Sequence, residues 1–124
     1  MSRDEVFLTG ATGFVGGHVL DALLAAGRPV RALVRSRGQL PARGGVTEVV
    51  GDVTRSGELV VAMRGCRALV HTAAAYSFVP AERARIRATH VAGTAGSLEA
   101  ARLAGVERAV VPSSSATVGP ARAG

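Results

Sequence analysis

The sequence predicts an α/β fold in which a parallel sheet is covered by helices on both faces. Three observations predict it: short apolar runs alternate with segments of helical period, the runs show no polar alternation, and glycines end the helical segments. Strands buried on both faces have continuous apolar runs, and alternating strands and helices build parallel sheets. We therefore expect a doubly wound sheet of five strands in the order 3-2-1-4-5, with right-handed crossovers.

The elements follow from the periodicity of the apolar residues. Five apolar runs are the expected strands, at residues 6–8, 29–34, 46–50, 68–71 and 106–111, and the polar segment 38–45 is expected to be a loop or a short helical turn. The expected helices are residues 15–26, 58–64 and 82–103. Gly27, Gly65 and Gly105 follow them as common helix stops. Gly93 and Gly96 inside the last helix each cost about 1 kcal/mol relative to alanine, so we expect that helix to approach the sheet closely.

Length and composition indicate a folded single domain over residues 1–124. A hydrophobic content of 48% and a mean hydropathy of +0.28 argue against disorder. Aromatic residues make up only 3% of the chain, so the core must be built from Val, Leu and Ala. Cys66 is the single cysteine, which excludes an intrachain disulfide, and we expect it to be a buried thiol.

The net charge of +6 comes from arginine alone, since the chain contains no lysine. The arginines are scattered, and in the densest group, Arg83, Arg85 and Arg87, the alternate spacing does not line one helical face. We therefore expect no binding of nucleic acid. No apolar run approaches the roughly 18 residues of a membrane span, and the acidic start differs from a signal peptide. We expect a soluble, cytoplasmic protein.

The segment Thr9–Gly16, with the sequence Thr-Gly-Ala-Thr-Gly-Phe-Val-Gly, connects the first strand to the first helix. In this context Gly10 permits a tight turn, Gly13 lets the backbone approach a pyrophosphate, and Gly16 lets helix and strand pack closely. The amides and the dipole of the helix start favour an anion there. We interpret the segment as a dinucleotide-binding turn, with a purely structural turn as the alternative. A nucleoside triphosphate loop would need a lysine.

Other candidate contacts stand where strands end. Arg35 follows the second strand, about 20 residues beyond the glycines, where an acid favours NAD and an arginine accepts the extra phosphate of NADP. No acid is near it in the sequence, so NADP is favoured and NAD stays an alternative, although surface arginines at strand ends are common. Asp52 follows the third strand and would either contact adenine or cap the next helix. The small residues 72–75 would admit a ligand or simply pack tightly.

Further motifs exclude two classes of chemistry. The serine run 113–115 has no Gly-x-Ser-x-Gly pattern, which argues against a hydrolase. Histidine, cysteine and acidic residues do not cluster at metal-ligand spacing, so no metal site is predicted. Tyr76 and Phe78 are expected either to line a substrate pocket or to cover the core.

Together these motifs resemble the extended short-chain dehydrogenases/reductases, also called the NAD-dependent epimerase/dehydratase family. The resemblance is carried by residues 9–16, 30–35, 51–53, 71–74, 76, 93–94 and 105–119. Within the family, the chain is most similar to the dihydroflavonol-reductase-like and hopanoid-associated sugar epimerase branch. The resemblance implies a Rossmann-type fold, a nicotinamide dinucleotide and, in the complete enzyme, a small-molecule substrate with a secondary alcohol or ketone. The last strand would be left as an unpaired sheet edge, which is an aggregation hazard. Oligomerisation is an alternative to a monomer that the sequence leaves open.

The family's cofactor-binding residues carry over to a defined set of positions. The resemblance implies cofactor contacts from Gly10, Thr12, Gly13, Phe14, Val15, Gly16, Arg35, Asp52, Val53, Thr72, Ala73 and Ala74. In that set, Arg35 would hold the 2′-phosphate, and Asp52 with Val53 would contact adenine.

The family's catalytic serine, which hydrogen-bonds the reacting oxygen, falls within the serine run. An ungapped count places it at Ser114, which we prefer, whereas the local Ser-Ala-Thr pattern places it at Ser115. Two features depart from the family: His90 stands where asparagine is usual, and no Tyr-x-x-x-Lys is present, because Tyr76 has Pro80 at its fourth position. We therefore expect the amino-terminal part of an oxidoreductase or epimerase, or a truncated copy, that binds cofactor but turns over little. The rival hypothesis is a non-catalytic dinucleotide-binding or sensing module.

Overall fold

The computed structural model describes residues 4–73, 80–113 and 120–121 of the chain. The strands of this part are β1 (Val6–Thr9), β2 (Val30–Val34), β3 (Val46–Val50), β4 (Ala68–His71) and β5 (Arg108–Val110). They form one sheet in which neighbouring strands are parallel and the order is β3-β2-β1-β4-β5. The fold class and the strand order predicted from the sequence are therefore confirmed.

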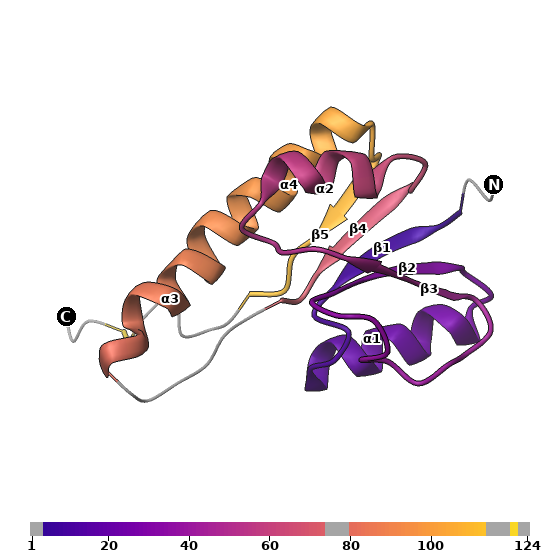
Figure 1. Cartoon of the computed structure of the whole chain (residues 1–124), viewed down its shortest axis with the longest axis horizontal. Helices are drawn as coiled ribbons and strands as arrows, with labels where there is room; N and C mark the ends of the chain where they lie inside the picture. Colours follow the sequence, from indigo (N-terminus) through magenta and orange to yellow (C-terminus); the bar gives the residue numbers. More distant parts are fainter. Residues whose placement is uncertain (1–3, 74–79, 114–119, 122–124) are drawn as a thin grey trace.

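Helices cover both faces of the sheet (Figure 1). The helical elements of the described residues are α1 (Phe14–Ala25), α2 (Ser56–Met63), η1 (Pro80–Glu82), α3 (Arg83–Arg87), η2 (Ala88–Ala92) and α4 (Gly93–Ala104). Side chains of β1 alternate between the two faces: Phe7 belongs to a core cluster with Leu59 of α2, and Leu8 to a second cluster with Leu20 of α1. None of the helices described is long and apolar enough to cross a membrane.

The helix expected over residues 82–103 is divided in the structure. Between α3 and α4 lies η2, a single π turn. Here the hydroxyl of Thr89, which is buried, donates to the carbonyl of Arg85 at 3.1 Å. A π turn places one extra residue in the helix and is frequent at functional sites. The apolar periodicity predicted the helix but not this interruption.

Gly93 and Gly96 allow the close approach that the sequence predicted, but to a different neighbour. A Cβ at Gly93 would lie 3.1 Å from Cγ2 of Val53, and one at Gly96 would lie 3.2 Å from Cβ of Ser56. These two glycines therefore approach the start of α2 and the loop before it, not the sheet. The glycines fix how the helix passes over Val53.

The last strand is shorter than predicted, because the residues before it complete the preceding helix. Gly105 takes a φ of +80°, and the N–H of Val106 donates to the Ala101 carbonyl at 2.9 Å. Only Arg108–Val110 then form β5, which lies at one edge of the sheet with its residues exposed.

A polar cluster joins the amino-terminal end of β2 to the end of α2. Arg31 donates to the carbonyls of Ala62 at 2.6 Å and Arg64 at 2.8 Å, and it forms an ion pair with Glu5. Cys66 lies beside this pair, with its Sγ 3.8 Å from Oε1 of Glu5, and is buried as predicted. Burial raises the pKa of the Cys66 thiol to about 11, which disfavours the nucleophilic thiolate form.

Candidate functional site

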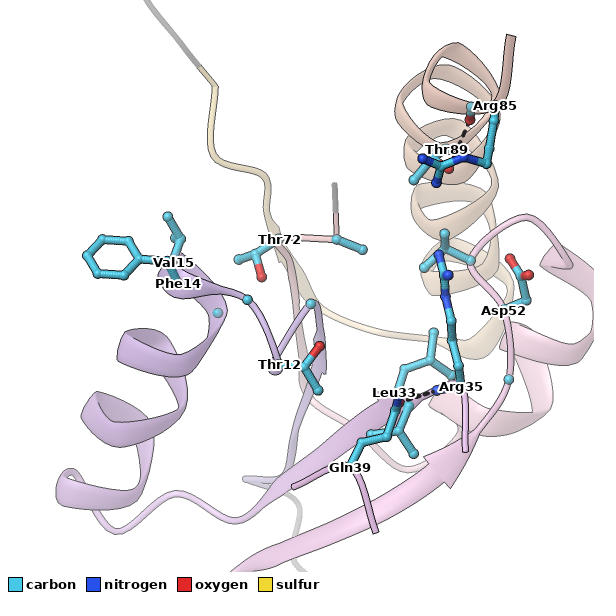
Figure 2. Close-up of a pocket in the computed structure, with 17 residues that line it drawn as sticks. Thr12, Phe14, Val15, Leu33, Arg35, Gln39, Asp52, Thr72, Arg85 and Thr89 are labelled. Atoms are coloured by element: carbon cyan, nitrogen blue, oxygen red, sulfur yellow. Dashed lines mark hydrogen bonds between the residues drawn. The ribbon is translucent and has the colours of Figure 1, made fainter. Parts of the chain in front are cut away.

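A cavity of about 570 Å³ opens at the carboxyl ends of β1 to β4. The sequence-predicted residues that line it are Gly10, Thr12, Gly13, Phe14, Val15, Gly16, Arg35, Asp52, Val53, Thr72 and Ala73 (Figure 2). Ala74, Ser114 and Ser115, together with Tyr76 and Phe78, lie outside the described residues. The structure therefore brings the expected cofactor contacts into one cavity, and it does not test the choice of catalytic serine.

The three glycines of the turn differ in what their missing side chains would meet. Gly10 has a φ of +77°, and a Cβ there would lie 2.6 Å from the backbone nitrogen of Ala73. A Cβ at Gly16 would overlap the carbonyl group of Gly10. At Gly13, by contrast, φ is −86° and a Cβ would lie at an ordinary 3.4 Å from the Gly10 oxygen. The fold requires glycine at the first and third positions, and it does not require it at Gly13, which borders the cavity.

The amino terminus of α1 supplies hydrogen-bond donors to the same place. A bond from the Gly17 N–H to the Gly13 carbonyl, 2.8 Å long, closes the first turn, and the amides of Phe14, Val15 and Gly16 precede it. Within residues 4–73, 80–113 and 120–121 no side chain caps this end, and its first turn contains no acid. The Phe14 side chain is 82% exposed and points away from the cavity in Figure 2. The first-turn amides and the positive end of the helix dipole are thus left for an anion.

A hydroxyl on β1 orders the segment that follows β4. Oγ1 of Thr9 accepts the backbone N–H groups of Thr72 at 3.1 Å and Ala73 at 3.2 Å. Because both acceptor positions are then used, its own proton is donated to Nδ1 of His71, 2.7 Å away. This assigns the neutral tautomer with the proton on Nε2, which donates to Oγ1 of Thr94 at 3.2 Å.

The same arrangement keeps His71 uncharged. Burial, with a smaller contribution from His90, lowers the pKa of His71 below its ordinary value of 6.5. The Thr72 hydroxyl adds a bond of 2.6 Å to the Thr9 carbonyl. The cavity wall at Thr72 is therefore fixed by hydrogen bonds between the two central strands.

Arg35 extends into the cavity from the end of β2 (Figure 2). Its backbone N–H donates to Oε1 of Gln39 at 2.9 Å. On β3, the Glu48 carboxylate accepts the amides of Gly38 at 3.0 Å and Leu40 at 3.3 Å. These bonds shape the loop after β2 through its backbone, so the guanidinium of Arg35 is not needed to hold the loop.

Asp52 stabilises a turn and does not cap a helix. Its Oδ1 accepts the backbone N–H of Thr54 at 2.8 Å and the hydroxyl of that residue at 2.7 Å. These two bonds and, to a smaller extent, the charges of Arg35 and Arg55 lower the pKa of the Asp52 carboxyl. The N-cap of α2 is Arg55, which makes no side-chain cap bond, so the helix-cap interpretation of Asp52 was wrong.

Several lining residues were missed by sequence reasoning. They are Leu33, Val34, Gln39, Gly51, Arg85 and Thr89. The first four flank predicted contacts at the ends of β2 and β3, so their positions could have been inferred from the strand ends. Arg85 and Thr89 come from the helix that precedes α4, and their spacing of four residues, which places them on one helical face, was the available signal. Among the residues described, no group of three or more His, Cys, Asp or Glu could hold a metal ion.

A glycine turn beside a helix N-terminus, at the carboxyl edge of a doubly wound sheet, defines a class of domains built to bind dinucleotides at that edge. Within this class, the chain belongs to the NAD dependent epimerase/dehydratase family, whose model matches residues 6–123. The family inferred from the sequence motifs is therefore confirmed.

Relatives with names and structures lie in the same family. The chain is 42% identical over 122 residues to a dihydroflavonol 4-reductase-like protein of Synechocystis sp., covering 94% of this chain and 34% of that protein. It is 38% identical over 114 residues to sterol demethylase protein B of Methylococcus capsulatus, covering 90% and 35%. The chain thus spans about a third of the length of these curated relatives.

Two solved structures show the same fold with a cofactor bound. MoeE5 in complex with UDP-glucose and NAD superposes with a TM-score of 0.80 and 34% identity, over 94% of this chain and 38% of that one. A short-chain dehydrogenase/reductase superfamily protein from Agrobacterium tumefaciens with bound NAD gives a TM-score of 0.73 and 38% identity, over 86% and 31%.

Proposed function

We propose that the chain is the nicotinamide-dinucleotide-binding portion of an oxidoreductase or epimerase that acts on a secondary alcohol or ketone. One observation carries the proposal: Gly13 has a backbone conformation open to any residue, and no atom in the described part of the chain crowds its missing side chain. The position borders the cavity beside the uncapped start of α1. A ligand that needs the backbone itself explains glycine there, and a diphosphate is the group that such a helix start favours.

The chemistry of the cavity fits a dinucleotide along its whole length. First-turn amides of α1 would hold the diphosphate, and Arg35 with the Asp52–Val53 loop would hold the adenosine part. Thr72 and Ala73 would flank the nicotinamide side. When bound, the dinucleotide supplies hydride chemistry, and the chain supplies binding and orientation.

We further propose that NADP is preferred over NAD, although both similar structures described above contain NAD. The support is Arg35, which lines the cavity at the end of β2 and whose guanidinium the loop does not need. Such an arginine accommodates a 2′-phosphate, with which it forms a charge-assisted bond. The serine of the family's chemistry would be Ser114 or Ser115. Because the chain contains no lysine, we propose that residues 1–124 alone bind the cofactor without turnover.

The experiment is a pair of charge reversals in the loop after β2. Arg35→Asp should weaken NADPH binding at least about tenfold, the effect of losing one charge-assisted contact, and should leave NADH within about threefold. Arg37→Asp makes the same change in charge outside the cavity lining and should leave both affinities near the wild-type values. Binding is followed by calorimetry. Equal loss of NADPH and NADH in Arg35→Asp would refute the NADP preference, and no binding of either by the wild type would refute the proposed function.

A further inference from the structure

A second arginine, Arg85, lines the cavity from α3, an element that the expected cofactor contacts do not include. Among the described residues that line the cavity, the charged side chains are therefore two guanidinium groups, Arg35 and Arg85, and one carboxylate, Asp52. One oxygen of that carboxylate, Oδ1, already accepts two hydrogen bonds from Thr54, one from its backbone N–H and one from its hydroxyl. The excess positive charge favours an anionic or electron-rich ligand group on the Arg85 side.

The register of the helix explains why Arg85 reaches the cavity although its neighbours do not. Gly93 packs against Val53, Thr89 lines the cavity one turn earlier, and Arg85 precedes Thr89 by four residues. Positions four apart share a helical face, and the hydrogen bond from the Thr89 hydroxyl to the Arg85 carbonyl joins the two turns. Figure 2 shows Arg85 and Thr89 together on the wall above Arg35 and Asp52.

The present partner of Arg85 is weak. Its Nη2 lies 3.5 Å from Oε2 of Glu82, three residues earlier, and both side chains are about half exposed, at 52% and 41%. Exposed pairs of this kind contribute little to stability. A ligand can therefore engage the guanidinium at small cost to the protein.

We propose that Arg85 binds the adenylate half of the dinucleotide, which NADH and NADPH have in common. The inference rests on the proposed function. It follows from the position of Arg85 in the cavity. The helix that carries Arg85 packs against Val53, which lies on the side proposed for adenosine, whereas the start of α1 and Thr72 form the opposite wall. A planar guanidinium both packs on an adenine face and donates to a phosphate. Arg85 thus contributes affinity for either cofactor, while Arg35 discriminates between them.

The test compares Arg85→Met with Arg87→Met, which removes the same charge from the same helix at a residue that does not line the cavity. Calorimetric titrations use NADPH, NADH and adenosine 5′-monophosphate, and thermal melts check that each variant is folded. Arg85→Met should weaken all three ligands about three- to tenfold, the range for one exposed cation–π or charge-assisted contact. Arg87→Met should stay within about twofold of the wild type, because it changes only the long-range field.

Three outcomes distinguish a failure of the role proposed for Arg85 from a failure of the proposed function. Equal affinities for Arg85→Met and Arg87→Met would overturn the role of Arg85 and leave the proposed function standing. A loss confined to NADPH would also overturn it, because Arg85 would then contact the 2′-phosphate. Absence of binding by the wild-type chain would instead refute the proposed function on which the inference rests. Arg85→Lys adds a geometric check: it keeps the charge but not the planar fork, so it should recover only part of the lost affinity.

Discussion

Alanine substitutions at the glycine turn separate what the fold needs from what a ligand needs. At Gly13 the backbone conformation suits alanine, and a Cβ would make an ordinary contact of 3.4 Å with the Gly10 oxygen. The cost is that of alanine as an N-cap, about 0.5–1 kcal/mol of unfolding free energy. At Gly16 a Cβ would overlap the Gly10 carbonyl group. Because backbone must move there, we expect Gly16→Ala to cost at least about 2–3 kcal/mol.

Cofactor affinity should depend strongly on Gly13, the position at which alanine costs little stability. The Cβ of Gly13→Ala would stand between the first-turn amides of α1 and the diphosphate, so NADPH affinity should fall about 10- to 100-fold, the loss of one or two charge-assisted hydrogen bonds. Gly17→Ala is the matched control: its Cβ would lie 3.7 Å from the Ala11 oxygen, and the residue does not line the cavity. It should stabilise the helix by about 0.5–1 kcal/mol and leave binding unchanged.

Urea unfolding followed by circular dichroism gives the stabilities, and calorimetry with NADPH gives the affinities. Wild-type affinity in a folded Gly13→Ala variant would refute the reasoning, because the space beside Gly13 would then not be the diphosphate site. Unfolding of Gly13→Ala, with Gly16→Ala intact, would refute the division of the glycines itself.

Two predictions concern stability alone. His71 has a lowered pKa, so the unfolded chain binds the extra proton first; its contribution to stability is complete above about pH 6.5 and is lost as the pH falls below that value. Urea midpoints of the wild type should therefore decline from pH 7 to 5 more steeply than those of His71→Gln, and parallel declines would contradict this. Arg31→Met should cost about 2 kcal/mol, because it leaves Glu5 unpaired and two carbonyls at the end of α2 without their donor. An Arg31→Met variant as stable as the wild type in urea would show that solvent replaces these contacts.

The strand order was predictable because each strand is a continuous apolar run and the connections are short enough to restrict the topology. The structural roles of Gly10 and Gly16 were predictable for a similar reason, because the turn joins a strand and a helix whose types were clear from the sequence. What the periodicity could not give was the π turn at Ala88–Ala92, because apolar spacing does not distinguish a helix with one extra residue from a regular one. Nor could it give the packing of Gly93 against Val53, because these residues are forty positions apart and no local pattern reports such a contact.

The sequence predicted lining residues that follow strands or begin α1, and it missed four of their neighbours at the ends of β2 and β3 as well as Arg85 and Thr89 from the helical segment before α4. Arg85 was judged against Arg83 and Arg87, whose alternate spacing argued against a shared face. The relevant comparison was with Thr89, four residues later, whose burial beside the cavity shows which face points inward. Asp52 was ambiguous in sequence because its two interpretations need the same residue type, and only its bonds to Thr54 decided against the helix cap.

The two walls of the cavity are built differently: one is formed by closely packed backbone, and the other by arginine side chains that reach into the cavity. The wall at Gly10, Gly16 and Thr72 consists of backbone packed against backbone and tied by the Thr9 hydroxyl. Its residues cannot change without cost to the fold, whereas Gly13 between them, on which the proposed diphosphate contact depends, can change at small cost. Arg35 and Arg85 instead reach in as side chains that stabilise neither their loop nor their helix to any large extent. Under the proposed function, affinity for the adenosine end and the choice between NADP and NAD would therefore depend on residues that can be exchanged while the sheet and the glycine turn stay as they are.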